Sequence, residues 1–141
     1  MIEMNTEEIM NALKDENTKE FPKEFFSDER INVVQYLKEL LEAHNMKVRD
    51  LIPKLGYERS YTYQMFNGTR VPTRVFVLRL GFILGLDYEG VQRTLFVTGN
   101  TMLYAKNRFD AVVIYALERS FDISQLEELL QDVGEKSLFW K

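Results

Sequence analysis

Residues 51–72 read LIPKLGYERSYTYQMFNGTRVP and carry two short helical patterns separated by a turn. In the first pattern, apolar residues recur at helical spacing: Val48, Leu51, Ile52 and Leu55. Gly56 ends that segment, since glycine adopts the left-handed backbone that reverses a chain after a helix. The second segment, Arg59–Phe66, has three residues to face inward, Thr62, Met65 and Phe66, and ends at Asn67-Gly68. The sequence therefore predicts two short helices joined by a tight turn.

The flanking sequence predicts further helices and no strands. Apolar side chains at helical spacing predict a helix from Glu29 to His44, with Asp28 and Glu29 at the positive end of its dipole. Residues suited to cap further helices are Thr73, Asp87, Asn107 together with Asp110, and Asp122. The helix after Thr73 is expected at the centre of the core because its apolar face is broad. The predicted fold class is all-α.

An internal similarity appears at a displacement of 35 residues. The matching residues are Asp87, Leu95, Gly99 and Leu103 against Asp122, Leu130, Gly134 and Leu138. Duplication of a helical unit is one interpretation. The other is that helices with an aspartate cap and a glycine stop resemble one another, and two copies are fewer than the three that make a repeat array.

Composition limits the class of protein. With 141 residues and 45% hydrophobic side chains, the chain is expected to form one domain with a sizeable core. It contains no cysteine, which excludes disulfides and thiolate zinc sites and favours a reducing compartment. The N-terminus lacks a basic signal-peptide region, and the apolar run Val75–Leu86 is too short for a membrane span. We therefore expect a cytoplasmic protein that does not enter a membrane.

The net charge of −4 conceals an uneven distribution. Residues 1–46 carry 5 basic and 11 acidic side chains, residues 47–79 carry 7 and 2, and residues 80–141 carry 6 and 9. The positive block coincides with the two short helices, where it would neutralise phosphates. The alternative is a chance cluster on a solvated face.

The two short helices resemble the helix-turn-helix of the phage-repressor-like, or XRE, family over about residues 30–97. The segments that carry the resemblance are Gly56-Tyr57, Arg59-Ser60, Met65-Phe66-Asn67-Gly68, Arg70 and Pro72. The resemblance implies a lambda-repressor-like, five-helix DNA-binding domain at residues 28–104. An acidic arm at 1–27, in which a short helix from Thr6 through Leu13 can form, would precede it, and a C-terminal helical hairpin at 105–141 would pack on it.

A longer resemblance, to helix-turn-helix regulators of Gram-positive bacteria, extends over most of the chain. It is carried by Arg59–Phe66, Leu103-Tyr104 and Arg108–Ala111. This second resemblance supports the fold more than the role.

The resemblance implies a role for each polar residue of the motif, with double-stranded DNA as the partner. Arg59, Ser60 and Gln64 would point at base edges, because arginine matches guanine and glutamine matches adenine in the major groove. Asn67, Thr69 and Arg70 would hold phosphate or the following base, although Ser60 and Thr69 suit phosphate equally. The remaining candidates are Tyr61, for sugar or thymine methyl contacts, and the positioning cations Lys47, Arg49 and Lys54. Half-buried tyrosines of a helical core are the alternative for Tyr61 and its neighbours Tyr57 and Tyr63.

The chain departs from the family pattern at five residues. Lys47-Val48 stand where a glutamine usually holds a phosphate, and Thr62 stands where a buried aliphatic residue is usual. Glu58 adds a negative charge beside the expected DNA surface. Pro53 lies inside the first short helix, so a kink or an early end of that helix is expected.

Two other classes of function are an enzyme and a protein-binding adaptor. An enzyme needs a poised acid, base, nucleophile or metal, and the single histidine, His44, stands at the expected end of a helix. We therefore expect no catalytic activity, no metal and no cofactor. The main alternative is a protein-binding adaptor that keeps the helix-turn-helix fold without reading DNA.

Assembly and partners are expected from the C-terminal end of the chain. A DNA reader of this kind usually forms a homodimer. The hairpin, with Leu138, Phe139 and Trp140 as exposed candidates, would supply the dimer surface or bind a protein partner. The alternative is a tail folded onto its own core.

Overall fold

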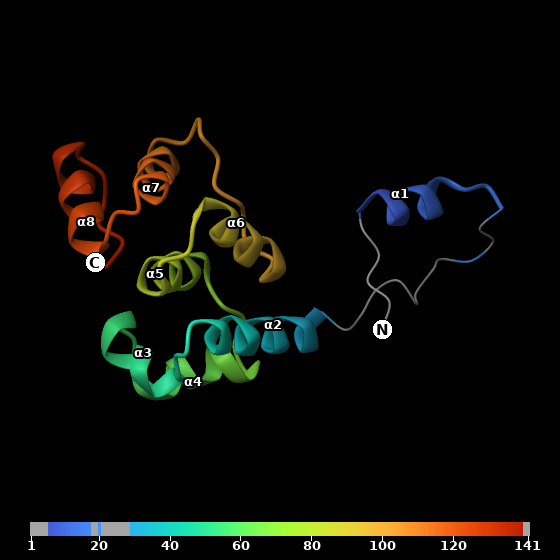
Figure 1. Cartoon of the computed structure of the whole chain (residues 1–141), viewed down its shortest axis with the longest axis horizontal. Coiled ribbons are helices and arrows are strands. Elements are labelled where there is room, and N and C mark those ends of the chain that lie inside the picture. Colours follow the sequence, from blue (N-terminus) through green and yellow to red (C-terminus); the bar gives the residue numbers. More distant parts are fainter. Residues whose placement is uncertain (1–5, 18–19, 21–28, 140–141) are drawn as a thin grey trace.

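A computed structural model of the chain describes residues 6–17, 20 and 29–139 (Figure 1). Asp28 and Trp140, which the sequence analysis singled out, lie outside these residues. The described residues form helices and no strand, which confirms the all-α class. The helices are α1 (Thr6–Lys14), α2 (Glu29–Ala43), α3 (Val48–Leu55), α4 (Arg59–Asn67), α5 (Arg74–Leu84), α6 (Tyr88–Val97), α7 (Arg108–Glu118) and α8 (Ile123–Asp132). No helix among them is long and apolar enough to cross a membrane.

Helix α5 lies at the centre of the helical body, as its broad apolar face predicts (Figure 1). It packs against α3 and α6, while α2 packs against α4 and α6. Phe76 of α5 is fully buried, and its ring contacts those of Phe66 and Tyr57 at centroid distances of 5.4 and 5.9 Å. Burial of these large side chains stabilises the packing of α4, and of the turn before it, on α5.

The predicted helix caps are present with one correction. The side chains of Thr73, Asp87, Asn107 and Asp122 each accept a hydrogen bond from the backbone N–H three residues further on. Asp110, which was expected to share in capping α7, binds elsewhere. Its carboxylate accepts hydrogen bonds from Arg74 and from the backbone N–H of Tyr104.

Pro53 does not end α3 early, so this half of the expectation was wrong, while the kink stays a prediction. The helix continues for two residues beyond Pro53 to Leu55. Leu51 and Leu55, on either side of the proline, are both fully buried, whereas Pro53 is exposed. Burial of the two leucines therefore outweighs the loss of one helical hydrogen bond at the proline.

The 35-residue similarity extends to the hydrogen bonds that end the helices. The turn between α5 and α6 has a hydrogen bond from Leu86 N to Gly81 O, and the turn between α7 and α8 repeats it from Phe121 N to Ala116 O. The bond from Asn100 N to Leu95 O recurs from Glu135 N to Leu130 O. The α7–α8 pair thus repeats the local geometry of the α5–α6 pair, and its first helix packs against α6. The division of the chain at residues 27 and 104 stays a prediction.

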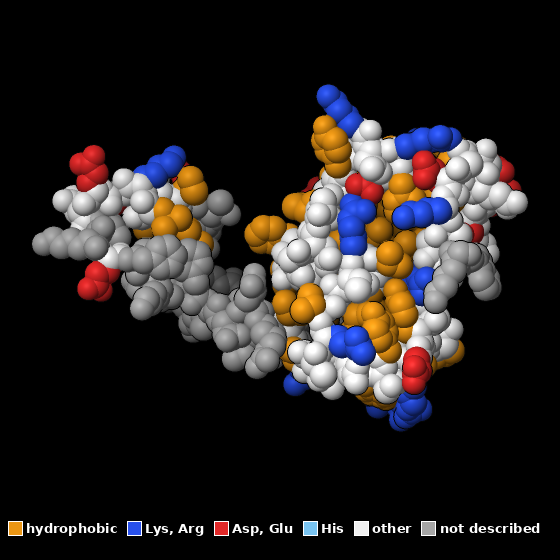
Figure 2. Space-filling model, turned by 180° about the vertical axis from the view of Figure 1, so that it is seen from behind, with side chains coloured by type: hydrophobic (Ala, Val, Ile, Leu, Met, Phe, Trp, Pro, Cys, Tyr) orange, Lys and Arg blue, Asp and Glu red, His pale blue; other side chains and the backbone are white. Residues whose placement is uncertain are grey.

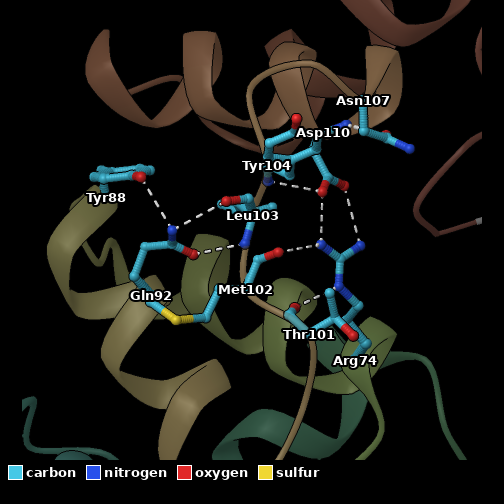
Figure 3. A network of polar contacts seen from close by, with 9 residues as sticks. All are labelled: Arg74, Tyr88, Gln92, Thr101, Met102, Leu103, Tyr104, Asn107 and Asp110. Carbon is cyan, nitrogen blue, oxygen red and sulfur yellow. Dashed lines mark hydrogen bonds and ion pairs between the residues drawn. The ribbon is translucent and has the colours of Figure 1, made fainter.

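A polar network fixes the connection between α6 and α7 (Figure 3). Arg74, at the start of α5, pairs with Asp110 of α7 at 2.8 Å and donates to the carbonyl oxygen of Thr101 at 2.8 Å. The Asp110 side chain is buried, with the residue only 4% exposed, and its carboxylate accepts hydrogen bonds from the Arg74 guanidinium and the Tyr104 N–H. Gln92 accepts from the N–H of Leu103 at 2.7 Å and donates to its carbonyl oxygen. A buried charge that is fully hydrogen-bonded in this way holds a specific arrangement.

The C-terminal tail packs on the body instead of projecting from it. Leu138, expected as an exposed candidate, is 3% exposed and belongs to the core, and Phe139 packs against that core. The two residues therefore follow the alternative of a folded tail. The apolar residues Met10 and Leu13 of α1, in contrast, are exposed.

Candidate nucleic-acid interface

Helix α3 owes its start and its end to local contacts. The Asp50 carboxylate accepts a hydrogen bond from the backbone N–H of Lys47 at 3.0 Å, which satisfies one donor before the first turn. At the other end Gly56 has φ = 78°, in the left-handed region that glycine tolerates. The chain therefore reverses within three residues and enters α4.

Helix α4 presents a dry inner face in which Thr62 replaces an aliphatic residue. Thr62 is 0% exposed, and its hydroxyl donates to the carbonyl oxygen of Glu58 at 3.0 Å. Because this bond satisfies the hydroxyl, its burial leaves no unmet donor. Met65 and Phe66 are buried beside it, so all three residues predicted to face inward do so.

The opposite face of α4 carries polar residues. At about 100° per residue, Ser60, Gln64 and Asn67 point away from the buried Thr62 and Met65. Ser60 and Asn67 are exposed, and Gln64 is partly exposed. Thr69 and Arg70, in the loop after α4, are also exposed. The Asn67 side chain accepts from the N–H of Thr69 at 2.9 Å, which fixes the start of that loop.

Gln64, Arg70 and Tyr61 form one unit. Nε of Arg70 donates to Oε1 of Gln64 at 2.6 Å, and the Arg70 N–H donates to the Gln64 carbonyl oxygen at 3.0 Å. The guanidinium of Arg70 also lies 4.7 Å from the centroid of the Tyr61 ring. Only the side-chain NH₂ group of Gln64 therefore remains to bind a base, because its Oε1 already accepts the hydrogen bond that orients Arg70. No pattern in the sequence predicts this pairing, which depends on the path of the loop.

Arg59 lies on the side of α4 opposite the unit of Gln64, Arg70 and Tyr61. Its guanidinium is 5.6 Å from the centroid of the Tyr63 ring, one helical turn away. This contact was not predicted, although a spacing of four residues on a helix favours it. Ser60 donates to the Glu58 carboxylate at 3.4 Å, a long contact that a phosphate oxygen could replace.

The cations of this surface have no ion-pair partners within the described part of the chain. The two ion pairs of that part involve Arg74 and Arg108. The cations outside those pairs on α3, α4 and the adjoining loops are Lys47, Arg49, Lys54, Arg59 and Arg70, all of them exposed. Lys and Arg side chains project at the lower edge of the body in Figure 2, where α3 and α4 lie. Five cations without ion-pair partners on the two short helices and their adjoining loops give this edge a positive potential in an acidic protein.

Tyr57 connects this surface with the core. Its ring lies 5.2 Å from that of Tyr61 and packs against Phe76. Burial raises the pKa of the Tyr57 hydroxyl, although the nearby charge of Arg79 acts in the opposite direction. Tyr57 therefore belongs to the support of α4 rather than to its polar face, which is the alternative that the sequence left open for it.

An apolar hollow adjoins the loop after α4. Its volume is about 350 Å³, and its lining includes Val33, Arg70, Val71 and Val97. Val71 is 77% exposed, and Phe96 of α6 is 71% exposed. Neither residue was expected to be exposed, and Phe96 directly follows the buried Leu95 in the apolar pattern of α6.

The histidine and the carboxylates of the described residues bear on whether the chain holds a metal or catalytic site. The single histidine, His44, donates from Nδ1 to the carbonyl oxygen of Leu40 at 2.8 Å near the end of α2. The described part of the chain contains no group of three carboxylate or histidine side chains that could hold a metal ion. Comparison of the chain with protein-family models, with curated proteins and with solved structures gives no match.

Proposed function

We propose that the protein is a sequence-specific DNA-binding transcriptional regulator that inserts α4 into the major groove. The observation that carries the proposal is the set of five exposed cations without carboxylate partners on α3, α4 and their loops. A solvated face of an acidic protein gains little from such a cluster, whereas a polyanion would neutralise it. We assign no catalytic activity, metal or cofactor to this surface.

The assignment of roles follows from exposure and contacts. Ser60 and Asn67 lie on the outer face of α4, where they would reach base edges or phosphates. Arg70, held by Gln64 and Tyr61, would present its two remaining amino groups to a guanine or a phosphate without losing much side-chain entropy. Lys47, Arg49 and Lys54 would contact the phosphate backbone and set the position of the helix.

The finer fold assignment belongs to the same proposal. Helices α2–α6 would form the lambda-repressor-like five-helix domain, with α3 and α4 as its helix-turn-helix. Such a domain covers only a few base pairs, so a homodimer on two half-sites would be needed for specificity.

The test is selection of DNA fragments from random and genomic pools by the purified protein at several salt concentrations. We expect enrichment of a defined sequence and an affinity that falls steeply with salt. A Gln64→Ala, Arg70→Ala double variant should lose the enrichment. Arg93→Ala, which removes an exposed arginine of α6, is the matched control and should retain it.

A second candidate function is a protein-binding adaptor. The Glu58 carboxylate favours it, because it stands at the start of α4, where helix N-termini usually attract phosphate. If the unaltered protein retains no DNA even at low salt, the DNA-binding proposal is wrong and the adaptor becomes the better assignment.

A further inference from the structure

Arg79 of α5 joins parts of the molecule that are distant in the sequence. Its Nη1 donates to the carbonyl oxygen of Leu55, the last residue of α3, at 2.9 Å. Its Nε donates to the carbonyl oxygen of Leu138 in the C-terminal tail at 3.0 Å. The guanidinium lies 4.6 Å from the ring centroid of Tyr57 and 5.0 Å from that of Phe139. We call this set of contacts the Arg79 clamp.

The clamp holds the turn between α3 and α4. The last carbonyl groups of a helix lack partners within the helix, and a cation there is favoured by the helix dipole. Arg79 meets both needs at Leu55, and its Nη1 lies 3.6 Å from where a Cβ on Gly56 would stand. Tyr57, the next residue, packs on the same guanidinium and contacts Tyr61 of α4. The direction in which α4 leaves the turn therefore depends on Arg79.

The tail is fixed at its other side by α8. Oε1 of Glu127 accepts hydrogen bonds from the backbone N–H groups of Leu138 and Phe139, both at 3.1 Å. The buried Leu138 side chain adds apolar contact. A continuous path of direct contacts thus runs from α8 through the tail and Arg79 to the start of α4.

We propose that Arg79 is a positioning residue for sequence-specific DNA binding. Through its contacts with Leu138 and Phe139, the C-terminal helical pair helps to hold α4 in the orientation that binds DNA. This inference rests on the proposed DNA-binding function. Arg79 is partly buried, and its Nε and Nη1 already donate to the carbonyl oxygens of Leu138 and Leu55, so it acts through Leu55 and Tyr57 and not on DNA itself. The exposed arginines of α4 and its loop would make the contacts with DNA.

The first measurement is amide hydrogen exchange in the full-length protein without DNA. Arg79→Gln and Phe139→Ala should each speed exchange in peptides spanning residues 52–63, since either change opens the clamp. Arg119→Gln is the matched control, because Arg119 contacts Tyr115 of its own helical pair and nothing in the helix-turn-helix. Unchanged exchange over residues 52–63 in both clamp variants would overturn the proposal.

The second measurement is DNA affinity, which separates positioning from a phosphate contact. Arg79→Gln should weaken binding to the selected sequence roughly tenfold, within the range for residues coupled by direct contact. Its salt dependence should stay unchanged, whereas loss of a phosphate contact would lower the slope by about 0.9. A lowered slope with unchanged sequence preference would show that Arg79 touches DNA, contrary to the proposal.

A double-variant cycle tests whether Arg79 and the tail act together. The combined Arg79→Gln, Phe139→Ala protein should bind DNA about as weakly as either single variant, because both remove the same clamp. Arg79→Lys should restore part of the affinity, since lysine keeps the charge near the rings but cannot donate to both carbonyl groups at once. Additive losses would mean that the tail has its own separate effect, and the proposed coupling would be wrong.

If the unaltered protein binds no DNA, the proposed function fails, while the exchange data still decide whether the clamp holds the turn.

Discussion

At the scale of single residues, the buried polar side chains in the described part of the chain are hydrogen-bonded. Thr62 sits in the inner face of α4 because Glu58 accepts its hydroxyl hydrogen. Tyr57 keeps its ring between the core and Arg79, with a hydroxyl in a partly dehydrated environment. Charge at this hydroxyl would disturb the support of α4, so pH should act on the fold here.

Stability should therefore fall at alkaline pH partly through Tyr57. Because burial raises the pKa of its hydroxyl in the folded state, the resulting stability is fully present below the ordinary tyrosine pKa of 10.0. This stability is lost as the pH rises through the raised pKa of the folded state, because the unfolded chain releases the proton at a lower pH. Urea unfolding between pH 8 and 11 should show a smaller loss for Tyr57→Phe than for the unaltered protein. Tyr104→Phe, at an exposed tyrosine, is the control, and an equal reduction there would contradict the assignment to Tyr57.

At the scale of elements, helix α3 depends on its neighbours for its stability. It has eight residues with a proline inside, which an isolated peptide would not keep helical. Burial of Leu51 and Leu55, the Asp50 contact at its start and the Arg79 contact at its end compensate. The same dependence makes its stability easy to change by one substitution.

Pro53→Ala should raise the free energy of unfolding by about 1–3 kcal/mol, because alanine restores the missing N–H and removes the ring clash. The lower end of the range allows for the greater freedom of the unfolded chain without the proline. Pro53 is exposed, so no core contact is lost. Urea titration measures the change. A destabilised Pro53→Ala protein would show that the proline is required for the course of α3.

At the scale of the whole molecule, two arginines of α5 connect the helix-turn-helix region with the second helical pair. Arg74 reaches Asp110 of α7 and the chain that leads to it, and Arg79 reaches the tail after α8. Both lie on one helix, five residues apart, so α5 links the two parts at two points. The repeated geometry of the α5–α6 and α7–α8 pairs extends the same core through α6 and α7.

Loss of the Arg74–Asp110 pair should be costly. Asp110→Ala leaves a mostly buried guanidinium without its carboxylate and frees the N–H of Tyr104, so we expect a loss of about 3 kcal/mol in the free energy of unfolding. Arg108→Ala removes a pair with Glu135 in which the arginine is exposed, and loss of this charge pair should cost less than about 1 kcal/mol. It also removes the hydrogen bond from Arg108 to the carbonyl oxygen of Val133. Chemical denaturation of both variants makes the comparison. Equal effects would mean that the buried network contributes no more than a surface pair.

The sequence by itself determined the helices, their caps and the inner and outer faces of α4, because these depend on residues within about one helical turn of one another. Gly56, Thr73 and Asp122 act as their local context predicts. Only the tertiary structure decided that Asp110 binds Arg74, that Arg70 lies against Gln64, and that the tail is buried. It also placed Arg79, whose partner Leu138 is 59 residues away in the chain. Such contacts arise from the way the helices pack, which the spacing of residues along one helix does not encode.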